Sequence, residues 1–92
     1  MNGETRENRL KRLRMRSWRR GIKEMDLVLG HFSDDCLDGL AEEDLILYDA
    51  LLSENDQDML RWITGLDPVP ARFAALFGVI ADHARARGTA AR

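Results

Sequence analysis

Residues 22–37 read IKEMDLVLGHFSDDCL and carry the clearest structural signal in the chain. Their apolar residues recur at spacings of three and four, which puts them on one side of a helix. These residues are Ile22, Met25, Val28, Leu29, Phe32 and Cys36. Gly39 follows, at the place where a glycine often ends a helix, so we expect the helix to stop there. An apolar stripe of this kind has to be buried, and the rest of the chain must cover it.

Helical patterns continue on both sides of this segment. Residues 6–19 are rich in Arg, Leu and Met, which favour helix. Further helices are expected over about 42–52, 56–64 and 70–87, and no alternating strand pattern competes with them. Residues 42–52 are apolar nearly all round, so this helix lies either at the centre or in an interface. Short links between the segments imply a compact all-α five-helix bundle.

The length of 92 residues suffices for one small domain over residues 1–92. We expect disordered tails at residues 1–5 and 88–92. So small a core leaves little room for a deep active-site cleft and a cofactor. The single cysteine, Cys36, excludes an intramolecular disulfide and a Cys-rich zinc site. Its place on the apolar stripe indicates an inert thiol, and no His or Cys spacing indicates a metal site or a catalytic nucleophile.

The chain has no run of 18 apolar residues, so we expect no membrane span. Its N-terminal part lacks the apolar centre of a secretion signal. It is rich in Arg, as transit peptides are, but Glu4 and Glu7 interrupt it and Ser is scarce. The sequence therefore predicts a cytoplasmic protein.

Charge is distributed unevenly along the chain. Residues 1–23 hold nine basic residues against two acidic ones, a net charge of +7, and residues 24–92 hold five against fourteen, a net charge of −9. Four arginines of the basic part share one helix face: Arg9, Arg12, Arg16 and Arg20. Three interpretations stay open: a solvated helix whose arginines offset acids elsewhere, a nucleic-acid contact, or a contact with an acidic protein. The stretch 24–60, which has no Lys or Arg, counts against nucleic acid.

The segment Arg19-Arg20-Gly21-Ile22-Lys23-Glu24 joins the first two expected helices. Gly21 either allows a turn with positive φ or lets another molecule approach the backbone closely. If the helix breaks at Gly21, the side chains of Arg20 and Glu24 can point outward together; if it continues, they can pair with each other. Spacing alone does not choose. Trp18, just before, is a core residue, a stacking platform or an interface anchor.

The segment Arg20-Gly21-Ile22-Lys23-Glu24 resembles the Arg-Gly-x-x-Glu signature of the SdhE-type succinate dehydrogenase assembly factors, the flavinylation factors. Its flanks over residues 16–32 are similar to that family as well. So are Leu51-Leu52, Asn55-Asp56-Gln57-Asp58 and Trp62-Ile63-Thr64-Gly65. The resemblance covers about residues 6–86. It departs at Ala41, where a Ser-like cap is expected before the third helix, and that concerns stability rather than function.

This resemblance implies a small five-helix protein that is not an enzyme. It implies binding to the flavoprotein subunit of succinate dehydrogenase, and in bacteria also that of fumarate reductase, with promotion of covalent FAD attachment to a His of that subunit. FAD would be attached to the partner, and this chain would hold no cofactor stably. The implied contact residues are Arg20, Gly21 and Glu24, flanked by Arg19, Met25 and Asp26.

We also expect a monomer when the chain is free, and no nucleic acid as partner. Two alternatives remain open beside the family resemblance. One is a nucleic-acid-binding bundle that uses the arginine helix. The other is a plain adaptor that associates with itself through the apolar third helix.

Overall fold

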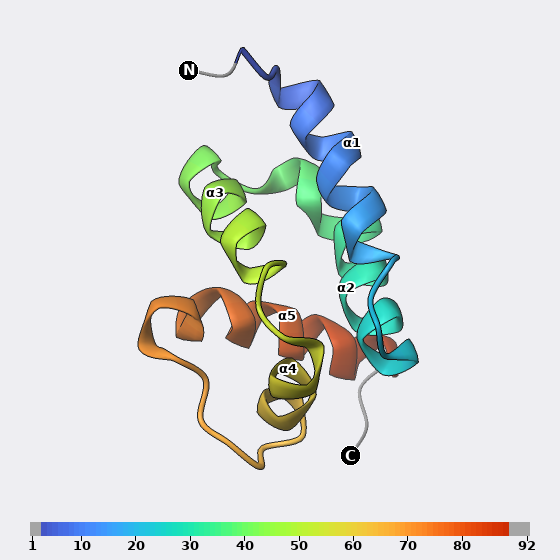
Figure 1. The fold of residues 1–92 in the computed structure, drawn as a ribbon, viewed down its shortest axis with the longest axis vertical. Helices are drawn as coiled ribbons and strands as arrows, with labels where there is room; N and C mark the ends of the chain where they lie inside the picture. The colour runs from blue at the N-terminus through green and yellow to red at the C-terminus, as the bar shows by residue number, and fades with distance from the viewer. Residues whose placement is uncertain (1–2, 89–92) are drawn as a thin grey trace.

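The computed structural model describes residues 3–88, and these form five α-helices and two 3₁₀ turns with no strand (Figure 1). The α-helices are α1 (Arg6–Ser17), α2 (Lys23–Cys36), α3 (Glu42–Leu51), α4 (Asp56–Ile63) and α5 (Ala74–Arg87). The 3₁₀ turns are η1 (Leu37–Gly39) and η2 (Ala71–Phe73). The predicted all-α, five-helix fold is confirmed, and the ends of the first four helices agree to within about two residues.

Helix α2 is the centre of the packing, with α1 alongside it and α4 and α5 against it (Figure 1). The stripe expected from the sequence is the buried face, with Met25, Leu29 and Phe32 fully buried. The other elements cover this face with apolar side chains of their own: Leu13 from α1, Leu45 and Leu51 from α3, Met59 from α4, and Phe77 and Ile80 from α5.

Tyr48 joins three helices in the middle of the core. Its ring is fully buried, and its hydroxyl lies 2.7 Å from the Ser17 Oγ of α1 and 3.4 Å from the Leu29 carbonyl of α2. Ser17 in turn donates to the Leu13 carbonyl at 2.8 Å. Burial raises the pKa of Tyr48 to about 12, so the hydroxyl stays neutral and keeps its proton for hydrogen bonding.

Trp18 packs directly over Gly30. A Cβ atom at Gly30 would lie 2.3 Å from Trp18 Cδ2, so only a glycine leaves room for the ring. The indole Nε1 donates to Asp34 at 3.2 Å, and the ring meets His31 edge-on with centroids 5.2 Å apart. Trp18 is therefore a partly buried structural residue that fastens the end of α1 to α2.

Helix α2 ends three residues before Gly39, and the chain continues as η1. Gly39 does not have a positive φ, so the predicted glycine end of this helix is wrong; the tighter turn instead buries Leu37. The last expected helix likewise begins with a 3₁₀ turn, η2, before α5, and it ends at Gly88 with φ +79° as expected.

The expected tails lie partly outside the described residues, which exclude residues 1–2 and 89–92. Inside them, Thr5 caps α1 by accepting a hydrogen bond from the Asn8 N–H at 3.1 Å. Glu4 pairs with Arg12 at 2.8 Å. Residues 4 and 5 thus belong to the folded structure and not to a disordered tail, because their side chains satisfy groups of α1.

Replacing Gly30 with Ala should lower the free energy of unfolding by about 1–3 kcal/mol, because the added methyl group has to displace the Trp18 ring. Urea unfolding followed by tryptophan fluorescence measures this. Gly78→Ala, on the exposed part of α5, is the matched control: its added Cβ meets nothing within 4 Å outside its own helix, so it should be neutral or slightly stabilising. A Gly30→Ala protein as stable as the wild type would show that Trp18 does not depend on this contact.

Candidate partner-binding site

The loop between α1 and α2 is held in place by two carboxylates. Asp56, the first residue of α4, accepts from Arg20 Nε at 2.7 Å and from the Gly21 N–H at 2.9 Å, with one oxygen for each. Asp26, in the first turn of α2, accepts from the Arg20 N–H at 2.6 Å. Both the side chain and the backbone of the loop are therefore fixed.

The position of Asp56 suits its charge. Asn55 caps α4 by accepting from the N–H groups of Gln57 and Asp58, and the positive end of the helix dipole favours an anion in this first turn. Only 7% of the Arg20 side chain is exposed, and a second nitrogen lies 3.4 Å from the Glu54 carbonyl. Since little water competes here, this ion pair holds the loop more firmly than an exposed pair would.

The six residues implied by the family resemblance fall into two groups. Arg19, Gly21 and Glu24 are exposed. The others face the protein itself: Arg20 turns toward α4, Asp26 binds the loop, and Met25 is fully buried in the core. Met25 therefore does not lie on a contact surface, because its position on the apolar stripe directs its side chain inward. Nor do Arg20 and Glu24 point outward together.

The backbone conformation and the packing at position 21 do not require a glycine. Its φ is not in the left-handed region, and an added Cβ would meet only the Asp56 Oδ2, at an ordinary contact distance of 3.5 Å. Of the two roles open from the sequence, a turn with positive φ is excluded. What remains is an exposed stretch of backbone that another molecule can approach closely.

A shallow hollow of about 480 Å³ lies beside Glu24, between the start of α2 and helix α4. Its other lining residues are Gln57, Leu60, Arg61, Thr64 and Leu66. Arg61 is held by Asp67 at 2.6 Å, whereas Glu24 forms no ion pair within residues 3–88. The Glu24 carboxylate is thus available to accept hydrogen bonds at the edge of a partly apolar hollow.

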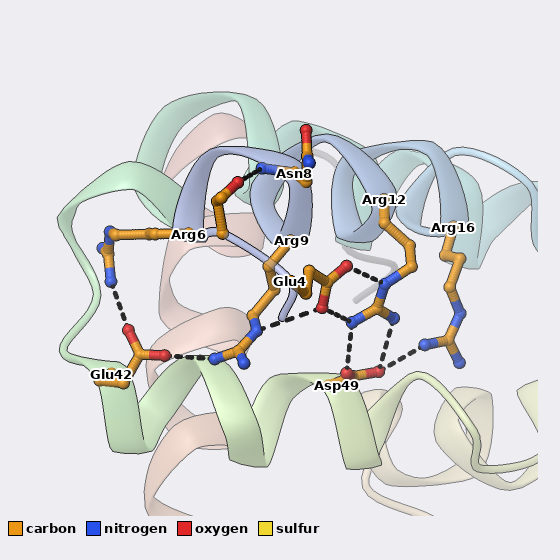
Figure 2. Close-up of polar contacts among 9 residues, drawn as sticks. Glu4, Arg6, Asn8, Arg9, Arg12, Arg16, Glu42 and Asp49 are labelled. Carbon is orange, nitrogen blue, oxygen red and sulfur yellow. Dashed lines mark hydrogen bonds and ion pairs between the residues drawn. The ribbon is translucent and has the colours of Figure 1, made fainter. Parts of the chain in front are cut away.

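The arginines on one face of α1 form ion pairs with acidic residues of the same chain (Figure 2). Arg6 and Arg9 reach Glu42 at the start of α3, and Arg12 and Arg16 reach Asp49 further along α3, at 2.9 and 2.6 Å. Arg20 lies beyond the end of α1 and so does not continue this face. The first interpretation, arginines that offset acids elsewhere in the domain, is the one that the structure shows.

Arg12 is the centre of this network, since it donates to both Glu4 and Asp49 (Figure 2). These hydrogen bonds lower the pKa of both carboxyl groups below their ordinary values. The network leaves few of the helix's cations free for phosphate.

Sequence reasoning did not single out Asp56 or Gly30, although both determine how the loop is held. Asp56 belongs to the segment Asn55-Asp56-Gln57-Asp58, which is part of the family resemblance. The Asn before it is typical of a helix N-cap and could have predicted that Asp56 begins a helix. Nothing local marks Gly30, because its need for space comes from Trp18, twelve residues earlier.

No group of three His, Cys, Asp or Glu side chains within residues 3–88 could hold a metal ion. Burial raises the pKa of the Cys36 thiol, which makes it a poor nucleophile. None of the described helices has both the length and the apolar character needed to cross a membrane. Tyr48 is a core residue, and Trp62 is partly buried against Phe73 and Phe77.

A family model described as "Flavinator of succinate dehydrogenase" matches residues 11–84, which include the loop, α2 and the whole of α4. The chain belongs to this family. The description of the family and the names of the relatives indicate assembly factors. The exposed Gly21 and Glu24 lie within the matched residues.

Three relatives illustrate the similarity, each named succinate dehydrogenase assembly factor 2, mitochondrial. The protein of Meyerozyma guilliermondii is 43% identical over 74 residues, covering 77% of this chain and 55% of the relative. That of Mycosarcoma maydis is 38% identical, covering 83% and 32%, and that of Schizosaccharomyces pombe is 41% identical, covering 76% and 50%. The chain thus spans between about a third and just over half of the length of these relatives.

The predicted cytoplasmic location is wrong by this comparison, since the relatives are named as mitochondrial proteins. The expectation rested on acids that interrupt the Arg-rich N-terminal part. The structure gives these arginines another role, because Arg6, Arg9 and Arg12 bind Glu4 and the acids of α3.

Asp49→Asn should make the stability of the protein less sensitive to acid. The pKa of Asp49 is lowered in the folded state, so on acidification the unfolded chain takes up its proton first, near the ordinary value of about 4. The stabilisation from its arginine pairs is therefore present above that pH and lost as the pH falls through the folded pKa. Urea unfolding across this range should give a flatter pH profile for Asp49→Asn; profiles that run parallel would contradict the assignment.

Arg20→Ala should lower the free energy of unfolding by about 1–3 kcal/mol, because it removes the hydrogen bonds of the guanidinium and leaves Asp56 without its ion-pair partner. Arg20→Lys should recover only part of the loss, since an ammonium group cannot reach Asp56 and the Glu54 carbonyl with the same fork. Thermal unfolding measures both. Arg85→Ala, which removes only an exposed pair with Asp82 on the same helix, is the control and should change little. Equal stabilities for all three variants and the wild type would show that Arg20 does not hold the loop.

Proposed function

We propose that this chain binds the flavoprotein subunit of succinate dehydrogenase and promotes the covalent attachment of FAD to it, without itself being an enzyme. The observation that carries the proposal is the geometry at Gly21: an exposed backbone where an added Cβ would meet only the Asp56 carboxylate, at 3.5 Å, on a loop fixed by Asp56 and beside Glu24, which has no ion pair within residues 3–88. Membership of the flavinator family supports the choice of partner.

The proposed action is positioning rather than chemistry. Covalent attachment requires the flavin and the acceptor side chain of the flavoprotein in one geometry, and holding reactants in place can supply several kcal/mol of a barrier. A protein that binds the competent arrangement of its partner raises the population of that arrangement. In this proposal Gly21 permits close approach, Glu24 accepts hydrogen bonds from the partner, and FAD becomes bound to the partner and not to this chain.

Arg20 and Asp26 contribute indirectly, since they keep the loop in its binding shape. A loop that is already ordered loses less conformational entropy on binding. Three sequence expectations remain predictions: the related flavoprotein of fumarate reductase as a second client, a monomeric free chain, and the absence of a nucleic-acid partner.

Gly21→Val should abolish the stimulation of flavin attachment while the protein stays folded, because the added side chain fills the space that the partner needs. Glu24→Ala should weaken the complex. The succinate dehydrogenase flavoprotein is produced in cells that lack their own assembly factor, with each variant, and flavin fluorescence of the denatured protein in a gel reports the covalent bond.

Gly39→Val is the matched control, since Gly39 is exposed, has no positive φ and has nothing within 4 Å of an added Cβ. It should stimulate as the wild type does. Full stimulation by Gly21→Val would exclude close approach at Gly21 as the explanation. A flavin fluorescence band of the flavoprotein that is equally strong with and without the wild-type chain would overturn the proposed function itself.

A further inference from the structure

Two shallow hollows lie on the outer side of α1, and they share Met15 and Arg19. One, of about 410 Å³, is lined by Lys11, Arg14, Met15, Trp18 and Arg19. The other, of about 320 Å³, is lined by Arg12, Met15, Arg16, Arg19 and Arg20. Met15 is 53% exposed and lines both hollows, so an exposed apolar side chain lies among mostly basic residues.

Most cations around these hollows are already neutralised. Asp49 binds Arg12 and Arg16, Asp38 binds Arg14 at 3.0 Å, and Asp56 binds Arg20. Within residues 3–88, Lys11 and Arg19 are the lining cations whose side chains have no ion-pair partner. The uncompensated positive charge therefore lies on the two sides of Met15.

We infer that the surface formed by Lys11, Met15, Trp18 and Arg19, here called the Met15 surface, docks an acidic segment of the flavoprotein that places an apolar side chain between two carboxylates. This inference rests on the proposed function. The Met15 surface includes Arg19, which lies two residues before Gly21 on the same loop, so a partner seated over Gly21 extends naturally onto α1.

Charge and shape favour a protein segment over nucleic acid as the occupant. A duplex backbone is bound by many free cations in succession, and here only two flank an apolar centre. Asp34 and Asp38 stand at the edge of the same surface, where they would repel a continuous line of phosphates. A short acidic segment needs only two matching charges and gains from burying Met15 and the arginine stems.

Lys11→Glu and Met15→Asp test the inference with the full chain and the isolated flavoprotein subunit. Both positions are exposed and lie outside the loop on which the proposed function depends, so the variants should unfold at the wild-type temperature. Affinity is measured by calorimetry at low and at physiological salt, with Gly21→Val alongside. Arg85→Glu is the control, because Arg85 is an exposed cation on α5 whose described partner is the neighbouring Asp82.

We expect each variant to weaken binding by about tenfold or more, and Lys11→Glu also to reduce the salt dependence, while Arg85→Glu binds as the wild type does. If Gly21→Val loses binding but Lys11→Glu and Met15→Asp keep it, the inference is overturned and the proposed function stands. If the wild-type chain does not bind the flavoprotein, both fall. A labelled DNA duplex is measured in parallel; Lys11-dependent binding to it, with flavoprotein binding unaffected, would assign the surface to nucleic acid and overturn the inference.

Discussion

One carboxylate, that of Asp56, fixes the loop between α1 and α2, on which the proposed function depends. It receives the guanidinium of Arg20 on one oxygen and the Gly21 N–H on the other, at the positive end of α4. The arginine of the family signature is therefore used inside the protein. Because Arg20 binds α4, its exposed neighbours Arg19 and Gly21 are held in a fixed arrangement, and an ordered loop loses less conformational entropy on binding than a mobile one.

Two glycines, the buried Gly30 and the exposed Gly21, have different structural requirements. Gly30 is required by the fold, since Trp18 occupies the place of a side chain there. Gly21 is not required by the fold, since its backbone is ordinary and a Cβ would meet only the Asp56 carboxylate at 3.5 Å. The absence of an internal requirement at Gly21 supports the close approach of a partner that we propose for this loop.

The charged side chains likewise fall into those that pair within the chain and those that stay unpaired on its surface. Most arginines of the strongly basic α1 form ion pairs with Glu4, Glu42 and Asp49 (Figure 2). The basic and acidic parts of the sequence therefore lie side by side in the folded molecule and largely neutralise each other there. Of the charged residues that line the hollows on the two sides of the loop, those without an ion-pair partner within residues 3–88 are Lys11 and Arg19 beside Met15, and Glu24 at the start of α2. Such a surface selects a partner of matching shape and charge rather than any polyanion.

The sequence by itself determined the helices and the buried face of α2, because the spacing of apolar residues is set by neighbours a few positions apart. The resemblance also pointed to the loop with its exposed Gly21, and to the exposed Glu24 in the first turn of α2. Only the tertiary structure decided that Arg20 faces Asp56 and that the arginines of α1 face α3. These outcomes join residues some 36 positions apart, as Arg20 and Asp56 are. Local spacing carries no information on such contacts, which depend on how the helices pack.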